Sequence, residues 1–364
     1  MAEALKNEIS PAFLRELCAA IEAKYPAFRR QSFLGRTSES HDWESRELKQ
    51  RIRTVADALR ENLPSGYREA VEILEEASDG ITGLKALVFC DFVEVYGLKN
   101  WKASMEAMER FTVLCSAEFA IRSFIEQDPA RAFEQLRKWS RSRNEHLRRL
   151  SSEGCRPLLP WGRRVKFLSE NPDRILELLE SLKEDPSRYV QKSVANNLND
   201  LSKLWPEKVL ETAEAWAGRH SNTDWIVKHG LRTFLKKGNP RALALFGYRD
   251  ADAYELQRFA LDCDSVRIGG ALDFEFTLRS IDGALGRLRV EYVVSYLKSN
   301  GSHSEKVFKV GEGDYGESER TWKVNQGFAD LSTRKHYEGR HYIELVANGK
   351  RLERRSFLLK GNSK

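Results

Sequence analysis

The sequence predicts a multidomain chain in which an α-helical solenoid of the HEAT kind is followed by a β-sandwich. Prolines recur at a fixed interval in the helical part, and apolar residues alternate with polar ones after about residue 254. At 364 residues, the chain also exceeds the usual length of one domain. We therefore expect a helical-repeat domain over residues 1–250 and a β-domain over residues 258–364.

The spacing of the prolines indicates paired helices. Pro172, Pro206 and Pro240 stand 34 residues apart, and Pro129 precedes the first of them by 43 residues. Proline is favoured at the first position of a helix, and a period of this size built from helix pairs is typical of α-solenoids. An irregular helical bundle is the alternative, because the repeats share little sequence.

One helix of this part is predicted in detail. Asp185 as the N-cap and Pro186 as the first helical residue would begin it. Apolar residues then line one helical face at Val190, Val194 and Leu198.

The carboxyl-terminal part has the period of strands. Apolar residues alternate strictly in LDFEFTL and nearly so in three later segments; the four are residues 272–278, 288–297, 321–324 and 341–346. Asn348-Gly349 is a two-residue hairpin signal, with residues 351–359 as the returning strand. About seven short strands in roughly 100 residues are typical of a β-sandwich.

Composition excludes several classes of protein. The five cysteines have no C-x-x-C spacing and the seven histidines form no H-E-x-x-H motif, so we expect no metal site, no disulfide framework and no cofactor. The amino terminus has no apolar run and no stretch of about 18 apolar residues exists, so we expect neither a signal peptide nor a membrane span. The expected location is the cytoplasm.

Positive charge is concentrated in one stretch. The net charge is +6, and residues 131–170 alone hold 11 Lys and Arg against 4 Asp and Glu. A local basic excess of this kind favours an acidic partner such as nucleic acid.

A polar stripe is predicted on the second helix of each pair. When Leu147, Val190 and Ile226 are aligned, the residues two positions later are Arg149, Lys192 and Lys228. Four residues further, on the same helical face, are Glu153, Asn196 and Arg232. Stacked helices would place these side chains along one inner surface that follows a phosphate backbone. The alternative is an ordinary solvated helix face.

Three carboxylates oppose that electrostatic pattern. Glu118, Glu153 and Asp200 are 35 and 47 residues apart, close to one repeat each. Asp200 ends the segment Asn196-Asn-Leu-Asn-Asp, which is rich in poor helix formers. A carboxylate that faces DNA needs a positive target, such as an alkylated base. The alternative for Glu118 is a surface pair with Arg122.

Trp161 is the candidate aromatic contact. It stands between Pro160 and Gly162, which argue against a regular helix, and cationic residues flank the segment. On such a turn the indole could stack on a nucleotide. The alternative is a core tryptophan that holds the loop down.

Three segments of the helical part and one of the β-part resemble a known family. They are HLRRLSSEGCRPLLPW at 146–161, VQKSVANNLNDLSK at 190–203, WIVKHGLR at 225–232 and LSTRKHYEGRHYIEL at 331–345. The chain resembles the AlkC branch of the AlkC/AlkD DNA alkylation repair glycosylases. The last segment is similar to the immunoglobulin-like tail of one AlkC subgroup.

The resemblance implies a function. It implies cleavage of the N-glycosidic bond of cationic bases, chiefly 3-methyladenine and 3-methylcytosine, in double-stranded DNA without extrusion of the base into a pocket. It implies that Asp200 is catalytic, that Glu118 and Glu153 lie near the lesion's deoxyribose, and that Trp161 forms an aromatic wall. It further implies a monomer, located on the nucleoid when bound, whose immunoglobulin-like domain grips the duplex.

We expect Asp200 to orient the attacking water, and Glu118 and Glu153 to stabilise an oxocarbenium-like state. The expected DNA-binding residues are Arg148, Arg149, Arg156, Arg163, Lys192, Asn196, Lys228 and Arg232. Two other functions compete with the glycosylase. One is a non-catalytic HEAT-repeat scaffold that binds nucleic acid or protein, and the other is a carbohydrate-binding role for the β-domain.

Overall fold

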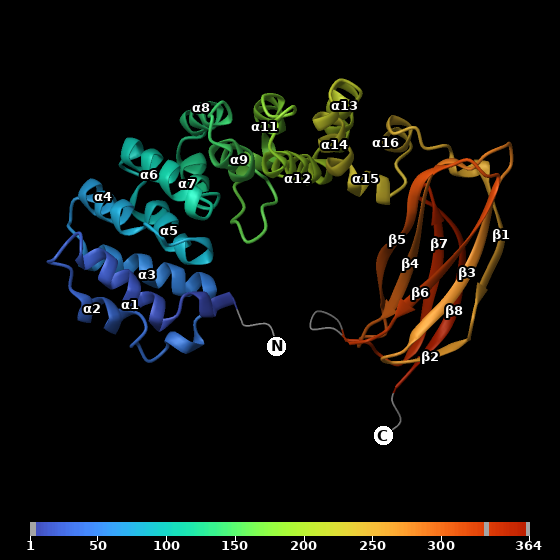
Figure 1. The fold of residues 1–364 in the computed structure, drawn as a ribbon, viewed down its shortest axis with the longest axis horizontal. Coiled ribbons are helices and arrows are strands. Elements are labelled where there is room, and N and C mark those ends of the chain that lie inside the picture. The colour runs from blue at the N-terminus through green and yellow to red at the C-terminus, as the bar shows by residue number, and fades with distance from the viewer. Residues whose placement is uncertain (1–4, 331–334, 362–364) are drawn as a thin grey trace. The chain divides into compact units, whose positions relative to one another are not determined.

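A computed structural model describes residues 5–330 and 335–361, and it has helices in the first part and strands in the second (Figure 1). The chain divides into two compact units after Gly230. The predicted order of a helical solenoid and a β-domain is confirmed. Residues 331–334, the start of the fourth family-like segment, lie outside the described residues.

The described residues of the first unit form helices and connecting loops, without strands. Its α-helices are α1 (Pro11–Glu22), α2 (Arg30–Arg36), α3 (Leu48–Asn62), α4 (Tyr67–Ala77), α5 (Leu87–Tyr96), α6 (Trp101–Leu114), α7 (Ala120–Gln127), α8 (Pro129–Ser140), α9 (Glu145–Gly154), α10 (Lys166–Glu170), α11 (Pro172–Glu180), α12 (Arg188–Leu204), α13 (Pro206–Trp216) and α14 (Ser221–Gly230). Three short 3-10 helices accompany them: η1 (Leu5–Glu8) before α1, η2 (Trp43–Ser45) and η3 (Gly83–Ala86).

The proline-based repeat is confirmed. Each of the four prolines occupies the first position of a helix: α8, α11, α13 and, in the second unit, α16. In the first unit, α8, α11 and α13 lie on the outer side of a curved array, and the partner helices α9, α12 and α14 lie on its inner side (Figure 1). Helix α12 packs between α9 and α14, so the second helices of successive pairs are neighbours.

The start of α12 differs from the prediction. The helix begins at Arg188 with Ser187 as its N-cap, and Asp185 was wrongly expected to cap it. The Asp185 carboxylate instead accepts a hydrogen bond from the Ser187 amide at 2.9 Å and from Arg148 at 2.6 Å. Asp185 was expected to cap α12, but its side chain forms a buried ion pair with Arg148 of α9.

The second unit contains two short helices and the strands. Helices α15 (Arg232–Lys236) and α16 (Pro240–Leu245) and the 3-10 helix η4 (Ala251–Ala253) come first. The strands are β1 (Tyr254–Leu261), β2 (Ser265–Arg267), β3 (Ala271–Ser280), β4 (Gly286–Leu297), β5 (His303–Tyr315), β6 (Glu319–Gly327), β7 (Gly339–Ala347) and β8 (Lys350–Lys360). Helices α15 and α16 belong to this unit, which begins at Leu231. We had expected the helical domain to continue to residue 250.

The strands form two sheets, as a sandwich requires. One sheet has the order β1-β3-β6 and the other β2-β8-β7-β4-β5. Their inner faces share one apolar core, which includes Phe276, Val294 and Ile343. All the segments predicted as strands lie within β3, β4, β6, β7 and β8.

The predicted hairpin turn is also present. Asn348 and Gly349 join β7 to β8, and their φ values are 42° and 80°. Two successive residues with positive φ match the right-handed twist of the strands. No helix among the described residues has the length and apolar character needed to span a bilayer.

Gly349 offers a test of this turn. A Cβ atom at Gly349 would lie 1.9 Å from the Gly238 Cα, whereas Gly301, with a similar φ of 78°, has no atom within 4 Å of such a Cβ. Alanine at either position carries the left-handed penalty of about 1 kcal/mol. The overlap with Gly238 should cost about 1–2 kcal/mol beyond this penalty, so Gly349→Ala should lower the melting temperature of the full chain by about 3–6 °C more than Gly301→Ala. Equal shifts in calorimetry would show that the contact with Gly238 has no energetic weight.

Candidate active site

Five charged side chains of the first unit form a row in space, in which acids and arginines alternate and each side chain contacts the next. We call Glu118, Arg149, Glu153, Arg156 and Asp200 the acid–arginine chain. The successive nitrogen–oxygen distances are 2.6, 3.5, 2.6 and 2.9 Å. The three acids that sequence singled out are thus brought together, and two arginines connect them.

Local structure explains how these residues meet. Arg149 and Glu153 are one turn apart on α9, so their side chains share a helical face. Arg156 lies two residues beyond the end of α9, and Glu118 lies in the turn that precedes α7. Asp200 comes from α12, which packs directly against α9.

Each member of the acid–arginine chain is largely removed from solvent. The exposed fraction of the side chain is 14% for Glu118 and 15% for Arg149, and 8% or less for the other three. Burial opposes the charge of Arg149, yet Glu118 and Glu153 together raise the pKa of this guanidinium. Likewise burial opposes the charge of Arg156, while Glu153 and Asp200 raise its pKa. Both arginines therefore remain cationic, as buried charges must when they are paired.

Hydrogen bonds distinguish the three carboxylates. Both oxygens of Glu153 are engaged, because Oε1 accepts from Arg156 and Oε2 accepts from the Ser193 hydroxyl at 2.6 Å. Glu118 uses Oε2 for Arg149 and for the Ser116 hydroxyl, and Asp200 uses Oδ2 for Arg156.

Two carboxylate oxygens keep capacity for another donor. Within the described ranges, no side chain donates a hydrogen bond to Glu118 Oε1 or Asp200 Oδ1, although Lys203 Nζ lies 3.8 Å from the latter. These are the oxygens of the acid–arginine chain that can receive a ligand or a water molecule. Three carboxylates against two arginines leave these five side chains with one formal negative charge, which the half-exposed Lys203 partly offsets.

The asparagine-rich segment of α12 ties helices together. Asn197 Nδ2 donates to the Ser152 carbonyl of α9 at 2.8 Å, and Asn199 Nδ2 donates to the Gly230 carbonyl of α14 at 3.0 Å. These inter-helix hydrogen bonds account for poor helix formers inside a buried helix. They also hold Asp200 in place, because it is the next residue after Asn199.

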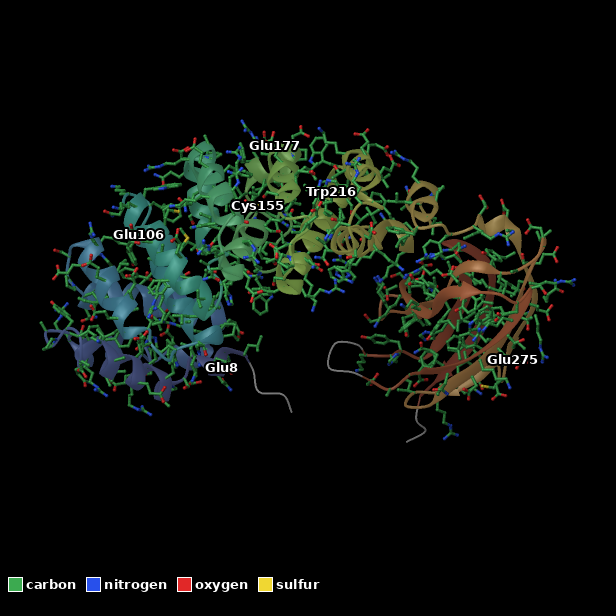
Figure 2. All side chains as sticks on the ribbon, turned by 45° about the horizontal axis from the view of Figure 1, so that its top comes forward. Glu8, Glu106, Cys155, Glu177, Trp216 and Glu275 are labelled. Carbon is green, nitrogen blue, oxygen red and sulfur yellow. The ribbon has the colours of Figure 1, made fainter. Side chains whose placement is uncertain are left out.

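Cys155 lies inside the site without a chemical role. Figure 2 labels it in the middle of the first unit, where it is fully buried and contacts Asn197. Burial raises the pKa of its thiol to about 12, so the thiolate that a nucleophile requires does not form at neutral pH. Among the described residues, no group of three His, Cys, Asp or Glu side chains is placed to hold a metal ion.

Three of the eight expected DNA-binding residues are engaged in internal ion pairs. Arg148 forms a nearly buried pair with Asp185 at 2.6 Å, and Arg149 and Arg156 belong to the acid–arginine chain. Their guanidiniums are occupied by carboxylates of the protein, so an open row of cations is not present there. Sequence spacing did not reveal the pairs with Asp185, Glu118 and Asp200, because these three partners are distant along the chain.

The other predicted DNA-binding residues have mixed surroundings. Lys192 on α12 is exposed and forms no ion pair with any described residue, and Arg163 forms a half-exposed pair with Glu126. Asn196 and Lys228 are partly exposed on α12 and α14. Arg232 begins α15 and belongs to the second unit.

The two structural alternatives for Trp161 and Glu118 are wrong. Trp161 is 58% exposed, so it is not a core residue. Arg122 is buried and donates to the carbonyl groups of Gly154, Arg156 and Arg163, so it does not pair with Glu118 on the surface.

Sequence reasoning missed two neighbours of the acid–arginine chain. Tyr189 is 39% exposed, and the Arg149 guanidinium lies 5.1 Å from the centre of its ring. Ser193, one turn later on α12, binds Glu153. The available signal was a second polar series at i, i+4 spacing, Tyr189, Ser193 and Asn197, beside the series that includes Lys192.

Comparison with known proteins covers both parts of the chain. Residues 111–234 match the family model described as a DNA alkylation repair enzyme, and residues 255–361 match the C-terminal Ig-like domain of the uncharacterised protein YhaZ. The chain is 41% identical to YhaZ of Bacillus subtilis (strain 168) over 346 residues, which cover 95% of this chain and 96% of that protein.

A solved structure is similar over nearly the whole length. It is the Pseudomonas fluorescens alkylpurine DNA glycosylase AlkC, bound to DNA that contains an abasic site analog. The TM-score is 0.92 at 35% identity, with 98% of this chain and 100% of that chain covered. The expected immunoglobulin-like character of the β-domain is confirmed.

The pairing of Arg156 can be tested through stability. Arg156→Met would leave Glu153 and Asp200 buried without their shared cation, which should cost about 3 kcal/mol. Arg163→Met removes a half-exposed pair of the same type and should cost less than about 1 kcal/mol. Denaturant unfolding of both variants, followed by the helical circular dichroism signal, checks the difference. Equal losses of unfolding free energy would contradict a buried cluster held together by Arg156.

Proposed function

Because the chain belongs to the DNA alkylation repair enzyme family, in its AlkC branch, we propose that it is a DNA glycosylase for cationic alkylated bases. Its substrates are 3-methyladenine and 3-methylcytosine in double-stranded DNA, and it acts as a monomer. The acid–arginine chain carries this proposal, since it combines burial, fixed geometry and one negative charge in a basic part of the sequence.

The chemistry of the lesion explains why carboxylates are sufficient. Alkylation at N3 makes the base cationic, so the base leaves as a neutral molecule when the N-glycosidic bond breaks and its electron pair passes to the base. No acid needs to protonate the leaving group. The barrier then depends on stabilising the positive charge that develops on the sugar, and a buried negative group does this better than water.

We assign different roles to the three acids from their hydrogen bonds. Asp200 Oδ1 accepts no hydrogen bond from a described side chain, so Asp200 orients the water that attacks C1′ and accepts its proton. Glu118 Oε1 faces the developing charge on the sugar. Glu153, with both oxygens engaged, holds Arg149 and Arg156 in place and contributes its charge at longer range.

Trp161 supplies an aromatic wall for this site. Its indole is exposed, and the electron-rich face of an indole attracts a cation more strongly than other aromatic side chains do. Contact with the alkylated nucleotide at the surface of the duplex needs no extrusion of the base into a pocket. Lys192, Asn196 and Lys228 would contact phosphates beside the lesion, and the immunoglobulin-like domain would grip the duplex.

Asp200→Asn is the direct test of the catalytic assignment. The amide still accepts a hydrogen bond from Arg156 but cannot take the proton of water, so release of 3-methyladenine from methylated DNA should fall at least about 100-fold. Binding to DNA with an abasic site analogue should stay within about threefold of the wild type, as for a group that acts in the transition state.

Asp173→Asn, in an exposed pair on the outer helix α11, is the matched control and should be fully active. Full activity of Asp200→Asn would remove this residue from the mechanism. If the wild-type protein itself released no base from methylated DNA, the non-catalytic scaffold would be favoured.

Lys192→Ala tests the phosphate contacts. The change should weaken binding to duplex DNA of any sequence and reduce the slope of log affinity against log salt by about one. Lys208→Ala, which removes a paired lysine on the outer helix α13, should leave the slope unchanged. Binding titrations over a range of salt concentrations give both slopes, and an unaltered slope for Lys192→Ala would place this residue outside the interface.

A further inference from the structure

Trp161 lies on a loop that is fastened at its ends. The loop connects α9 to α10, and Arg122 of α7 donates to the carbonyl groups of Gly154, Arg156 and Arg163 at 2.8–3.0 Å. Arg122 is 1% exposed, so one buried guanidinium joins the two ends of the loop. This arrangement fixes the two ends of the loop, so the position of its tip must depend on other contacts.

The tip of the loop has an uncommon backbone. Trp161 has a φ of 61°, in the left-handed region that residues with a side chain rarely adopt. Its indole is exposed, so packing does not hold it in this conformation. Strained residues of this kind persist only where other contacts determine them, and they concentrate at functional sites.

Lys49 of α3 makes that contact. Its ammonium donates a hydrogen bond to the Trp161 carbonyl and lies 4.6 Å from the centre of the Phe119 ring. Phe119 directly follows Glu118 in the sequence. A single exposed lysine, 112 residues away along the chain, therefore contacts the loop tip and the residue next to a site carboxylate.

The contacts with Trp161 and Phe119 are the interactions that define the role of Lys49, because the neighbouring acids have other partners. Lys49, Phe119 and Trp161 line one cavity of about 620 Å³. The acids of this cavity have other partners, since Asp91 pairs with Arg53, Asp42 pairs with Arg46, and Glu94 accepts a hydrogen bond from Ser123. In the part of the chain that the structure describes, Lys49 forms no ion pair of its own.

We propose that Lys49 is a positioning residue of the site. Its ammonium contacts both the Trp161 carbonyl and the Phe119 ring. Because Phe119 directly follows Glu118, these contacts fix the indole relative to the Glu118 carboxylate. This inference rests on the proposed glycosylase activity. Lys49 acts through Trp161 and does not itself touch the lesion.

The experiment combines substitutions at Lys49 and Trp161 in the full-length protein. The rate of 3-methyladenine release in a single turnover should fall about tenfold in Lys49→Met, because a small misplacement of a positioned group has large effects. Lys49→Arg can donate to the same carbonyl and should retain most of the rate. Lys102→Met removes an exposed lysine of α6 and serves as the control.

A double-mutant cycle shows whether Lys49 acts through the indole. In a Trp161→Ala background, Lys49→Met should reduce the rate by less than about twofold, because the two changes then remove the same interaction. Affinity for DNA with an abasic site analogue, and its salt dependence, should not change in Lys49→Met. A loss of affinity with a smaller salt slope would identify Lys49 as a phosphate contact and overturn the proposal, as would a full tenfold effect in the Trp161→Ala background.

A second measurement does not depend on activity. Hydrogen exchange of the loop amides around Trp161 should become faster in Lys49→Met and stay as in the wild type in Lys49→Arg and Lys102→Met. Unchanged exchange together with an unchanged rate would refute the role of Lys49. If the wild-type protein released no base at all, the proposed function would fail, and the exchange measurement would still decide whether Lys49 holds the loop.

Discussion

The first unit depends on the pairing of buried carboxylates with buried arginines. An acid removed from water is costly unless a cation and hydrogen bonds compensate it. Here Arg149 lies between Glu118 and Glu153, and Arg156 lies between Glu153 and Asp200. Because three acids share two arginines, the five side chains carry one formal negative charge, and Lys203 lies 3.8 Å from Asp200 at the edge of this cluster.

The fold is arranged so that this cluster can form. Successive helix pairs bring α9 and α12 into contact, and hydrogen bonds from Asn197 and Asn199 fix α12 to the helices on either side. Arg122 gathers the ends of the loop that carries Arg156 and Trp161. Side chains from the turn before α7, from α9 and the loop after it, and from α12 thus meet at one place, although Glu118 and Asp200 are distant from α9 in sequence.

Periodic features of the chain were predictable, and pairwise contacts were not. Prolines at a constant interval gave the helix pairs, and the repeat spacing of Glu118, Glu153 and Asp200 indicated neighbouring positions. Arg148, Arg149 and Arg156 have carboxylate partners on other elements, so three residues expected to bind DNA form internal ion pairs instead. Lys49 was not found at all, because its contact with Trp161 has no sequence signal.

The central claim is that the site stabilises a positive charge at the deoxyribose. It is tested most directly by comparing two abasic-site analogues in otherwise identical duplexes, one with a neutral ring and one whose ring nitrogen is protonated. A site complementary to a cationic transition state should bind the charged analogue at least about tenfold more tightly. Equal affinity for the two duplexes at the same salt concentration would contradict the account.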